Sequence, residues 1–313
     1  MAPDVEGYRA EVRAFIAEHA IPIAAEGVRA PKNASEEAAI RSWLRALYDA
    51  GHLGAGWPEE WGGRPHHPAV FDLVLMEELI LGDAYRPLDQ VMLAAHTLIA
   101  FGTDTQQNDL LPKIRNAEHI WCQLFSEPDA GSDLASLRTR AEPDADGFVV
   151  NGQKTWSTDA QWADMATLLA RTDPDVDRHA GITAFAIPMD LPGIEVRPIR
   201  EMTGHEEFCE VFLDDVRLGP EHVLGEVNDG WKVVTSGLAS ERAFVGANAI
   251  QLERLFQDLV MLARHARLPD GTAAIAHEDI QAKLAGARAR VEEVKLIVRD
   301  TVDRILVDDE HPS

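Results

Sequence analysis

Apolar and polar residues follow three successive patterns along the chain, which has 313 residues. In the first, over residues 5–118, apolar residues recur at steps of three and four, as at Val12, Phe15 and Ile16. This spacing places them on one face of a helix and predicts a series of amphipathic helices. The glycine- and proline-rich run 54–68 (GAGWPEEWGGRPHHP) interrupts the pattern and predicts a loop.

The second pattern begins near Ile120 and consists of short runs of β-branched and aromatic residues separated by glycine, proline and aspartate. Such runs predict strands, and we expect a small antiparallel β domain. Asn151 and Gly152 stand between FVV and QKTW. This dipeptide is typical of a two-residue hairpin turn, because both central positions need positive φ. The sequence therefore predicts that the chain reverses its direction at these two residues.

The third pattern, after Asn228, is helical again. One apolar stripe runs over 231–262 and a second over 284–305, with the linker 267–279 between them. Two long amphipathic helices in succession are typical of part of a helical bundle. The predicted fold class is α+β multidomain, with an N-terminal helical domain over 1–118, a middle antiparallel, β-barrel-like domain over 119–226 and a C-terminal helical domain over 227–313.

The charge balance narrows the classes of partner. The chain has 53 acidic and 29 basic residues, which gives a net charge of -24. We therefore expect no binding to nucleic acid and none to anionic membranes. An anionic ligand would have to be held locally, by helix N-termini, backbone amides and a few arginines.

The cysteines and the lack of a long apolar run indicate a soluble, cytoplasmic protein. Cys122 and Cys209 fit a reducing compartment and argue against a disulfide framework or a cysteine zinc site. No apolar run approaches the ~20 residues that span a bilayer, and the acidic, amphipathic N-terminus does not resemble a signal peptide. The pair His66–His67 and the run 205–210 (HEEFCE) match no defined ligand spacing, so we expect no metal site.

Two short runs carry candidate chemistry. Residues 126–133 (SEPDAGSD) directly follow the predicted strand WCQLF, and taken singly they are ordinary turn residues. Together they place small residues at 130–132, which let another molecule approach backbone amides closely. On the strand that follows, 154–158 (KTWST) offers a flat apolar plate at Trp156 and two hydroxyl donors. These features favour a planar heteroaromatic ligand such as a flavin.

The segment 122–158 (CQLFSEPDAGSDLASLRTRAEPDADGFVVNGQKTWST) resembles the signature of the acyl-CoA dehydrogenase family, with its TEPxAGSD and GxKxWIT boxes at matching separation. WGG near Trp61, LPKI near Leu111 and LGE near Leu224 are also similar to that family, and the resemblance runs over about residues 5–300. It implies the α–β–α fold, FAD as cofactor and an acyl-CoA substrate. It further implies an electron-transfer flavoprotein as oxidant, and assembly as a homodimer, a homotetramer or a heterotetramer with a related subunit.

Carried over position by position, the resemblance also implies the cofactor contacts. They are Gln123, Leu124, Phe125, Ser126, Gly131, Ser132, Trp156, Ser157, Thr158 and Arg267. Ser126 would place its hydroxyl near the reactive edge of the flavin, Trp156 would stack on the ring, and Thr158 would hydrogen-bond to it. Arg267 would reach the FAD of a neighbouring subunit, with Asp270 standing where the family usually has a phenylalanine.

The activity that the resemblance implies is α,β-dehydrogenation of an acyl-CoA thioester. A carboxylate removes the α-proton, and the β-hydrogen leaves as hydride to the flavin. In many members this carboxylate comes from a helix near the C-terminus, a segment that would lie beyond Ser313, so the C-terminal domain is expected to be incomplete. In the isovaleryl-CoA and long-chain type members it precedes an arginine on the first long helix of that domain, where this chain has Glu241 and Arg242.

Helical phase supports Glu241 independently of the resemblance. Leu238, Glu241 and Val245 are three and four residues apart and share one face, whereas Arg242 is turned away by about 100°. A carboxylate on an apolar face is costly unless it is paired or used, so Glu241 is the expected catalytic base. The alternative is a structural ion pair with Arg242, with Arg45 or with another charge distant in the sequence. The expected substrate contacts are Ser132, Ser240 and Arg242.

Two other functions stay open at the level of the sequence. One is a non-catalytic partner subunit of a heteromeric dehydrogenase that binds FAD and CoA, which the early end of the chain favours. The other is a flavin oxidase or monooxygenase on the same fold, which would react with oxygen instead of passing electrons to a protein.

Overall fold

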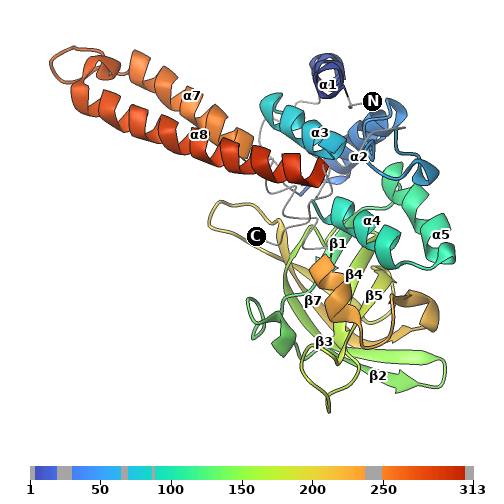
Figure 1. The fold of residues 1–313 in the computed structure, drawn as a ribbon. Coiled ribbons are helices and arrows are strands. Elements are labelled where there is room, and N and C mark those ends of the chain that lie inside the picture. Colours follow the sequence, from blue (N-terminus) through green and yellow to red (C-terminus); the bar gives the residue numbers. More distant parts are fainter. Residues whose placement is uncertain (1–3, 20–29, 65–69, 87–88, 237–248, 307–313) are drawn as a thin grey trace. The chain divides into compact units, whose positions relative to one another are not determined.

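The computed structural model describes residues 4–19, 30–64, 70–86, 89–236 and 249–306 (Figure 1). The chain divides into two compact units, one made of residues 1–25, 54–86 and 242–313 and the other of 26–53 and 87–241. The first unit is helical, and the second holds the sheet. The predicted fold class, helices before and after a middle β region, is confirmed.

The first unit contains the helices that begin and end the described chain. These are α1 (Val5–His19), α3 (Val70–Leu81), α7 (Ala249–His265) and α8 (Glu278–Leu306), with the short 3₁₀ helices η2 (Glu59–Trp61) and η5 (Ala274–Ala276). Figure 1 shows α7 and α8 side by side as a helical hairpin. Glu253 of α7 accepts hydrogen bonds from Arg288 at 2.7 Å and Lys295 at 3.0 Å, both on α8. Helix α8 thus confirms the second predicted helix, and α7 confirms the first over 249–262, while residues 237–248 of that stripe lie outside the described residues.

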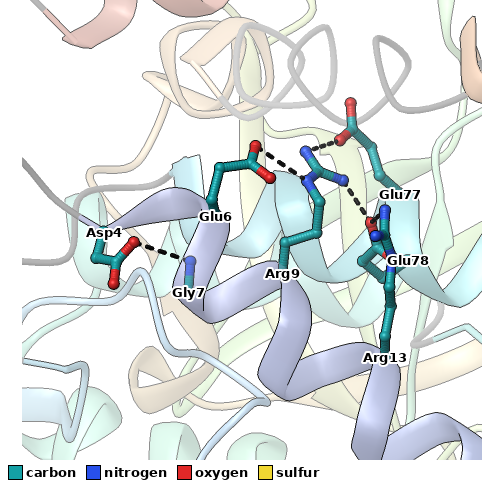
Figure 2. A network of polar contacts seen from close by, with 7 residues as sticks. All are labelled: Asp4, Glu6, Gly7, Arg9, Arg13, Glu77 and Glu78. Carbon is teal, nitrogen blue, oxygen red and sulfur yellow. Dashed lines mark hydrogen bonds and ion pairs between the residues drawn. The ribbon is translucent and has the colours of Figure 1, made fainter.

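A network of charges joins α1 to α3 (Figure 2). The Glu78 carboxylate, 1% exposed, accepts hydrogen bonds from Arg9 Nη1 and Arg13 Nε, each at 2.5 Å. Arg9 also donates to Glu77 at 2.7 Å. Because two guanidinium groups on successive turns of α1 converge on one carboxylate of α3, they fix how these two helices pack.

The second unit begins with three helices, namely α2 (Ala34–Asp49), α4 (Asp89–Phe101) and α5 (Asp104–Arg115). The start of α2 follows from its N-cap, since Asn33 accepts hydrogen bonds from the amides of Ser35 and Glu36. A capping box of Thr103 and Gln106 begins α5. The Gln106 amide nitrogen also donates to the carbonyls of Glu221 and Val223 at 2.9 Å, which ties α5 to the chain that leaves the sheet.

The sheet has eight strands in the described residues, with the order β6-β7-β3-β2-β4-β5-β8 and β1 paired to β4. The strands are β1 (Trp121–Leu124), β2 (Arg140–Asp144), β3 (Gly147–Thr158), β4 (Met165–Arg171), β5 (Ile182–Pro188), β6 (Ile194–Ile199), β7 (Phe208–Leu218) and β8 (Val223–Leu224). β1 runs parallel to β4, and β2 meets β4 in a short parallel contact. The sheet is thus mostly antiparallel, as predicted, with two parallel pairings that make it mixed.

The predicted hairpin turn at Asn151 and Gly152 was also wrong. Both residues lie inside β3, and the turn that joins β2 to β3 falls at residues 145–146, before Gly147 with φ 147°. Gly152 is required for another reason, because a Cβ there would lie 2.4 Å from Thr139 Oγ1. Asn151 donates to Asp215 Oδ1 at 3.0 Å. Gly152 therefore allows Thr139 to pack closely against β3, and Asn151 forms a hydrogen bond to the neighbouring strand.

Both cysteines lie in the apolar core of the sheet, and neither forms a disulfide. Burial raises the pKa of Cys209 to about 11 and that of Cys122 well above its ordinary value. Both are therefore unreactive thiols in the folded protein. Among the helices of the described residues, none combines the length and the apolar character that crossing a bilayer requires.

Candidate functional site

The first predicted cofactor residues lie on β1 and just after it. Along this strand side chains alternate between the two faces, so Cys122 and Leu124 are fully buried in the core of the sheet. Gln123 and Phe125 are half-buried and line a small pocket on the other side. Leu124 therefore offers a ligand its backbone and not its side chain. Its predicted contact with a flavin stays a prediction.

The loop 126–133 is a tight turn with an open outer side. Glu127 N donates to Ala130 O at 2.8 Å, and Ala130 N donates back to Glu127 O at 3.1 Å. The three residues that follow, Gly131, Ser132 and Asp133, are exposed. A Cβ built on Gly131 would meet nothing within 4 Å. The space beside its backbone is therefore wide enough for another molecule to approach.

Trp156 is the most unusual residue of the adjoining strand. Its backbone is left-handed, with φ 57°, at an irregularity in the pairing of β3 with β7. A bulky residue adopts this conformation only at a cost, and such strain clusters at functional sites. The indole is 60% exposed, and Phe208 contacts it edge-on with ring centroids 5.8 Å apart. The sheet thus presents a large aromatic plate at its surface, as predicted from the KTWST run.

Ser157 and Thr158 follow Trp156 and differ in exposure. The side chain of Ser157 is 1% exposed, and its hydroxyl has no hydrogen-bond partner among the residues that the structure describes. A buried hydroxyl does not present itself to a ligand at the surface, so only the Ser157 backbone is available there. Thr158 is half-buried and pairs with Phe208 across the strands. The roles predicted for both stay predictions.

An ion pair that sequence reasoning missed joins the loop to the strand. Lys154 Nζ, on a side chain that is 0% exposed, lies 2.8 Å from Glu127 Oε1. Burial lowers the pKa of Lys154 to about 8, although the Glu127 charge opposes that shift. Burial would raise the pKa of Glu127, but the charge of Lys154 and the hydrogen bonds to its carboxylate outweigh this and lower it. Both groups are therefore charged near neutral pH.

A second buried acid, also missed, follows the same strand. Asp159 is 1% exposed and accepts a hydrogen bond from Trp162 Nε1 at 2.9 Å. Burial raises its pKa to about 7, and the negative charge of Glu207 adds to the shift. Its place at the end of KTWST could have drawn notice in the sequence. Burial of this residue, however, follows from the turn that it begins, where its amide donates to Glu207 O at 2.8 Å.

The structure brings together part of the predicted site. Thr155 N donates to Ser126 O at 2.9 Å, so the loop with Ser126, Gly131 and Ser132 adjoins the strand with Trp156 and Thr158. Arg267 belongs to the other unit, where its exposed side chain donates to the Arg264 and Ala266 carbonyls. The expected base and two of the substrate contacts lie outside the described residues, namely Glu241, Ser240 and Arg242.

One further cavity of the described residues is separate from this site. A cavity of about 1160 Å³ in the second unit is lined by α5, the ends of β4 and β5 and the chain after β7, and by none of the predicted site residues. Within the described ranges no group of three or more histidine, cysteine and acidic side chains is placed to hold a metal ion.

Comparison with known proteins identifies the class to which this fold and loop–strand arrangement belong. The N-terminal, middle and C-terminal domain descriptions of acyl-CoA dehydrogenase match residues 2–118, 122–216 and 228–313. The chain belongs to the acyl-CoA dehydrogenase family, whose members depend on FAD, and it is an oxidoreductase of that class.

Individual relatives support this assignment. The chain is 41% identical over 276 residues to acyl-CoA dehydrogenase IpdE1 of Mycobacterium tuberculosis, covering 85% of this chain and 71% of the relative. The solved Tcur3481-Tcur3483 steroid ACAD aligns with a TM-score of 0.86 and 30% identity over 97% of this chain and 77% of that one. The ChsE4-ChsE5 complex from Mycobacterium tuberculosis aligns with a TM-score of 0.84 and 31% identity, over 100% and 78%.

Proposed function

We propose that this protein catalyses the FAD-dependent α,β-dehydrogenation of an acyl-CoA thioester. The observation that carries the proposal is the junction of loop 126–133 with the end of β3, where an exposed Trp156 stands beside a turn of small residues. A large aromatic plate on a strained backbone, next to open backbone amides, suits a planar, polar-edged ring.

The residues present fit an isoalloxazine ring. The indole of Trp156 would stack on it, the hydroxyls of Ser126 and Thr158 would bond to its polar edge, and the amides at Gly131 and Ser132 would face the more anionic part of the cofactor. When bound, FAD would supply the two-electron acceptor that the oxidation needs. The chain's own part at this site is to hold the ring flat and to shield one of its faces from water.

Glu241 is proposed as the group that removes the α-proton. Its support is the helical phase that puts it on an apolar stripe and the family placement of a carboxylate before an arginine, here Arg242. A poorly solvated carboxylate has a raised proton affinity and is a stronger base. Ser132, Ser240 and Arg242 are the proposed substrate contacts, and an electron-transfer flavoprotein is the proposed oxidant.

Anaerobic mixing of the FAD-loaded protein with acyl-CoA tests this function. The wild type is expected to lose its flavin absorbance, whereas Glu241→Gln is expected to bind acyl-CoA with no loss of absorbance, because an amide does not accept the α-proton. Glu142→Gln, at a side chain 63% exposed on β2, is the matched control and should react like the wild type. Loss of absorbance in Glu241→Gln at the wild-type rate would rule out Glu241 as the base.

The rate at which flavin absorbance is lost also tests which acyl group the protein accepts, and the rate at which it returns tests the oxidant. One solved relative is described as a steroid dehydrogenase, so we propose a bulky cyclic acyl chain and expect faster reduction with a steroid-ring acyl-CoA than with a straight-chain one. Fast reoxidation by oxygen alone would instead indicate an oxidase or monooxygenase.

A second candidate is a partner subunit in a heteromeric dehydrogenase. It is favoured because two solved relatives are described by pairs of names, ChsE4-ChsE5 and Tcur3481-Tcur3483. In that case the chain purified alone would contain no flavin, and flavin would appear only when a related subunit is purified with it.

A further inference from the structure

The carboxylate of Glu127 accepts three hydrogen bonds from two separate segments of the second unit. Oε1 accepts from Lys154 Nζ at 2.8 Å and from Thr139 N at 2.9 Å, while Oε2 accepts from Arg138 N at 2.6 Å. Lys154 belongs to β3, and Arg138 and Thr139 lead into β2. One side chain of the loop is therefore bonded to β3 and to the segment that leads into β2.

The ammonium group of Lys154 completes this arrangement on the other side of Ser126. It donates to Phe125 O at 3.0 Å, and the next amide of its strand, Thr155 N, donates to Ser126 O at 2.9 Å. The main chain on both sides of Ser126 is thus bonded to β3, two residues from Trp156. A shift of the pair would move the Ser126 hydroxyl relative to the indole.

The buried ion pair of Lys154 and Glu127 is expected to add little to the stability of the fold. Lys154 is 0% and Glu127 7% exposed, and the cost of removing both charges from water often equals their mutual attraction. A buried ion pair with many fixed hydrogen bonds defines geometry better than an apolar pair of the same volume, since each bond has a preferred direction. The bonds of this pair join Glu127 of the loop to the amides that lead into β2, and join β3 to the Phe125 carbonyl directly before the loop.

We infer that Glu127 and Lys154 are positioning residues for the flavin: their ion pair holds Ser126 and the turn at 130–132 in place relative to Trp156, and thereby sets the affinity for FAD. This inference rests on the proposed function. Neither side chain is assigned a contact with the ring or with the substrate, and both act through the loop and the strand.

The test is a double-mutant cycle with two readouts, using Lys154→Met, Glu127→Gln and the double variant. FAD is removed from each purified protein, and FAD affinity is then measured by fluorescence quenching and stability without FAD by urea unfolding. Lys154→Met should be the least stable, because it leaves a buried carboxylate without its partner. The double variant should regain much of that stability yet bind FAD about tenfold more weakly than wild type, a difference of about 1.4 kcal/mol.

A double variant that regains stability but not FAD affinity shows that the pair positions the flavin site and is not merely structural. If FAD affinity returns to the wild-type value together with stability in the double variant, the pair is structural only and the inference is wrong. Glu78→Gln, which disturbs a buried ion pair of the other unit, is the control and should lower stability while leaving FAD affinity unchanged. If urea unfolding shows that Lys154→Met does not fold, the inference is judged from Glu127→Gln and the double variant. Glu127→Gln keeps an acceptor oxygen in place of the carboxylate.

Failure of the proposed function gives a different result. A wild type that binds FAD but shows no loss of absorbance with acyl-CoA contradicts the dehydrogenase proposal and leaves the flavin-positioning inference to be judged by the cycle. If acyl-CoA reduces the wild type and the double variant binds FAD as tightly as the wild type does, the positioning inference is wrong while the dehydrogenase proposal stands.

Discussion

The Asp159→Asn variant is expected to be more stable than the wild type near pH 8, by up to about 4 kcal/mol, and equally stable near pH 4. Asp159 is almost fully buried, and this burial is the main cause of the rise of its pKa to about 7. Ionising the carboxyl group inside the folded protein costs free energy, which a neutral amide avoids. The amide oxygen can still accept the hydrogen bond that Trp162 Nε1 donates to Asp159 Oδ1.

The sign follows from proton binding in the two states. In the unfolded chain Asp159 ionises near its ordinary pKa of 3.8, whereas in the folded protein it keeps its proton up to about pH 7. Between these values the folded state binds more protons, so the contribution of Asp159 to the free energy of unfolding falls as pH rises. This contribution is fully present below pH 3.8 and is lost above about pH 7.

Urea unfolding of both proteins at several pH values measures this difference. Asp144→Asn is the control of opposite sign, because the Ala145 amide and then Arg217 lower the pKa of Asp144, an exposed residue. Its contribution is present at neutral pH and lost in acid, so this variant should gain nothing near pH 8. A stability difference between Asp159→Asn and wild type that does not change with pH would contradict the raised pKa.

The Glu78→Gln variant is expected to lose about 3 kcal/mol of stability, since it leaves two guanidinium groups facing a neutral amide. Glu78 is 1% exposed, and the Arg9 side chain beside it is 18% exposed, so solvent replaces the lost charge poorly (Figure 2). Arg13 is 59% exposed, so water can solvate its charge in the variant. The expected loss of stability therefore lies at the lower end of the range for buried ion pairs.

The same network provides the control for this prediction. Glu6 lies 3.8 Å from Arg9 and is 87% exposed, so Glu6→Gln should change stability by less than about 1 kcal/mol. Shifts in the urea midpoint measure both variants. Equal shifts for Glu6→Gln and Glu78→Gln would show that burial of the Glu78 carboxylate contributes nothing to the interaction.

The periodicity of apolar residues predicted the helices and the strand region because burial of one face is a local property of the sequence. The Asn151–Gly152 dipeptide misled because its turn preference is also local, whereas its use here depends on Thr139 and Asp215, which only the folded sheet brings near. Patterns in the local sequence therefore predicted the helices and strands better than the turns that connect them.

The Glu127–Lys154 pair shows the same limit within the candidate site. The two residues are 27 positions apart, and nothing in either short run marks the other as its partner. The strand irregularity that turns Trp156 outward also breaks the alternation that would have assigned Lys154 and Ser157 to a face. The motifs thus predicted which segments meet, while the charges that join them depend on the register of the sheet.

The pairing of β3 with β7 has a consequence for how the protein acquires its site. Their partners, from Thr158 with Phe208 to Phe148 with Leu218, are 50 to 70 positions apart along the chain. Contacts between such distant segments form slowly, because the entropy of closing the intervening loop is lost before the contacts are gained. The helices need no such closure. During synthesis, the end of β3 that carries Trp156 therefore has no partner strand until β7 has left the ribosome, and a cofactor added earlier meets an unformed site.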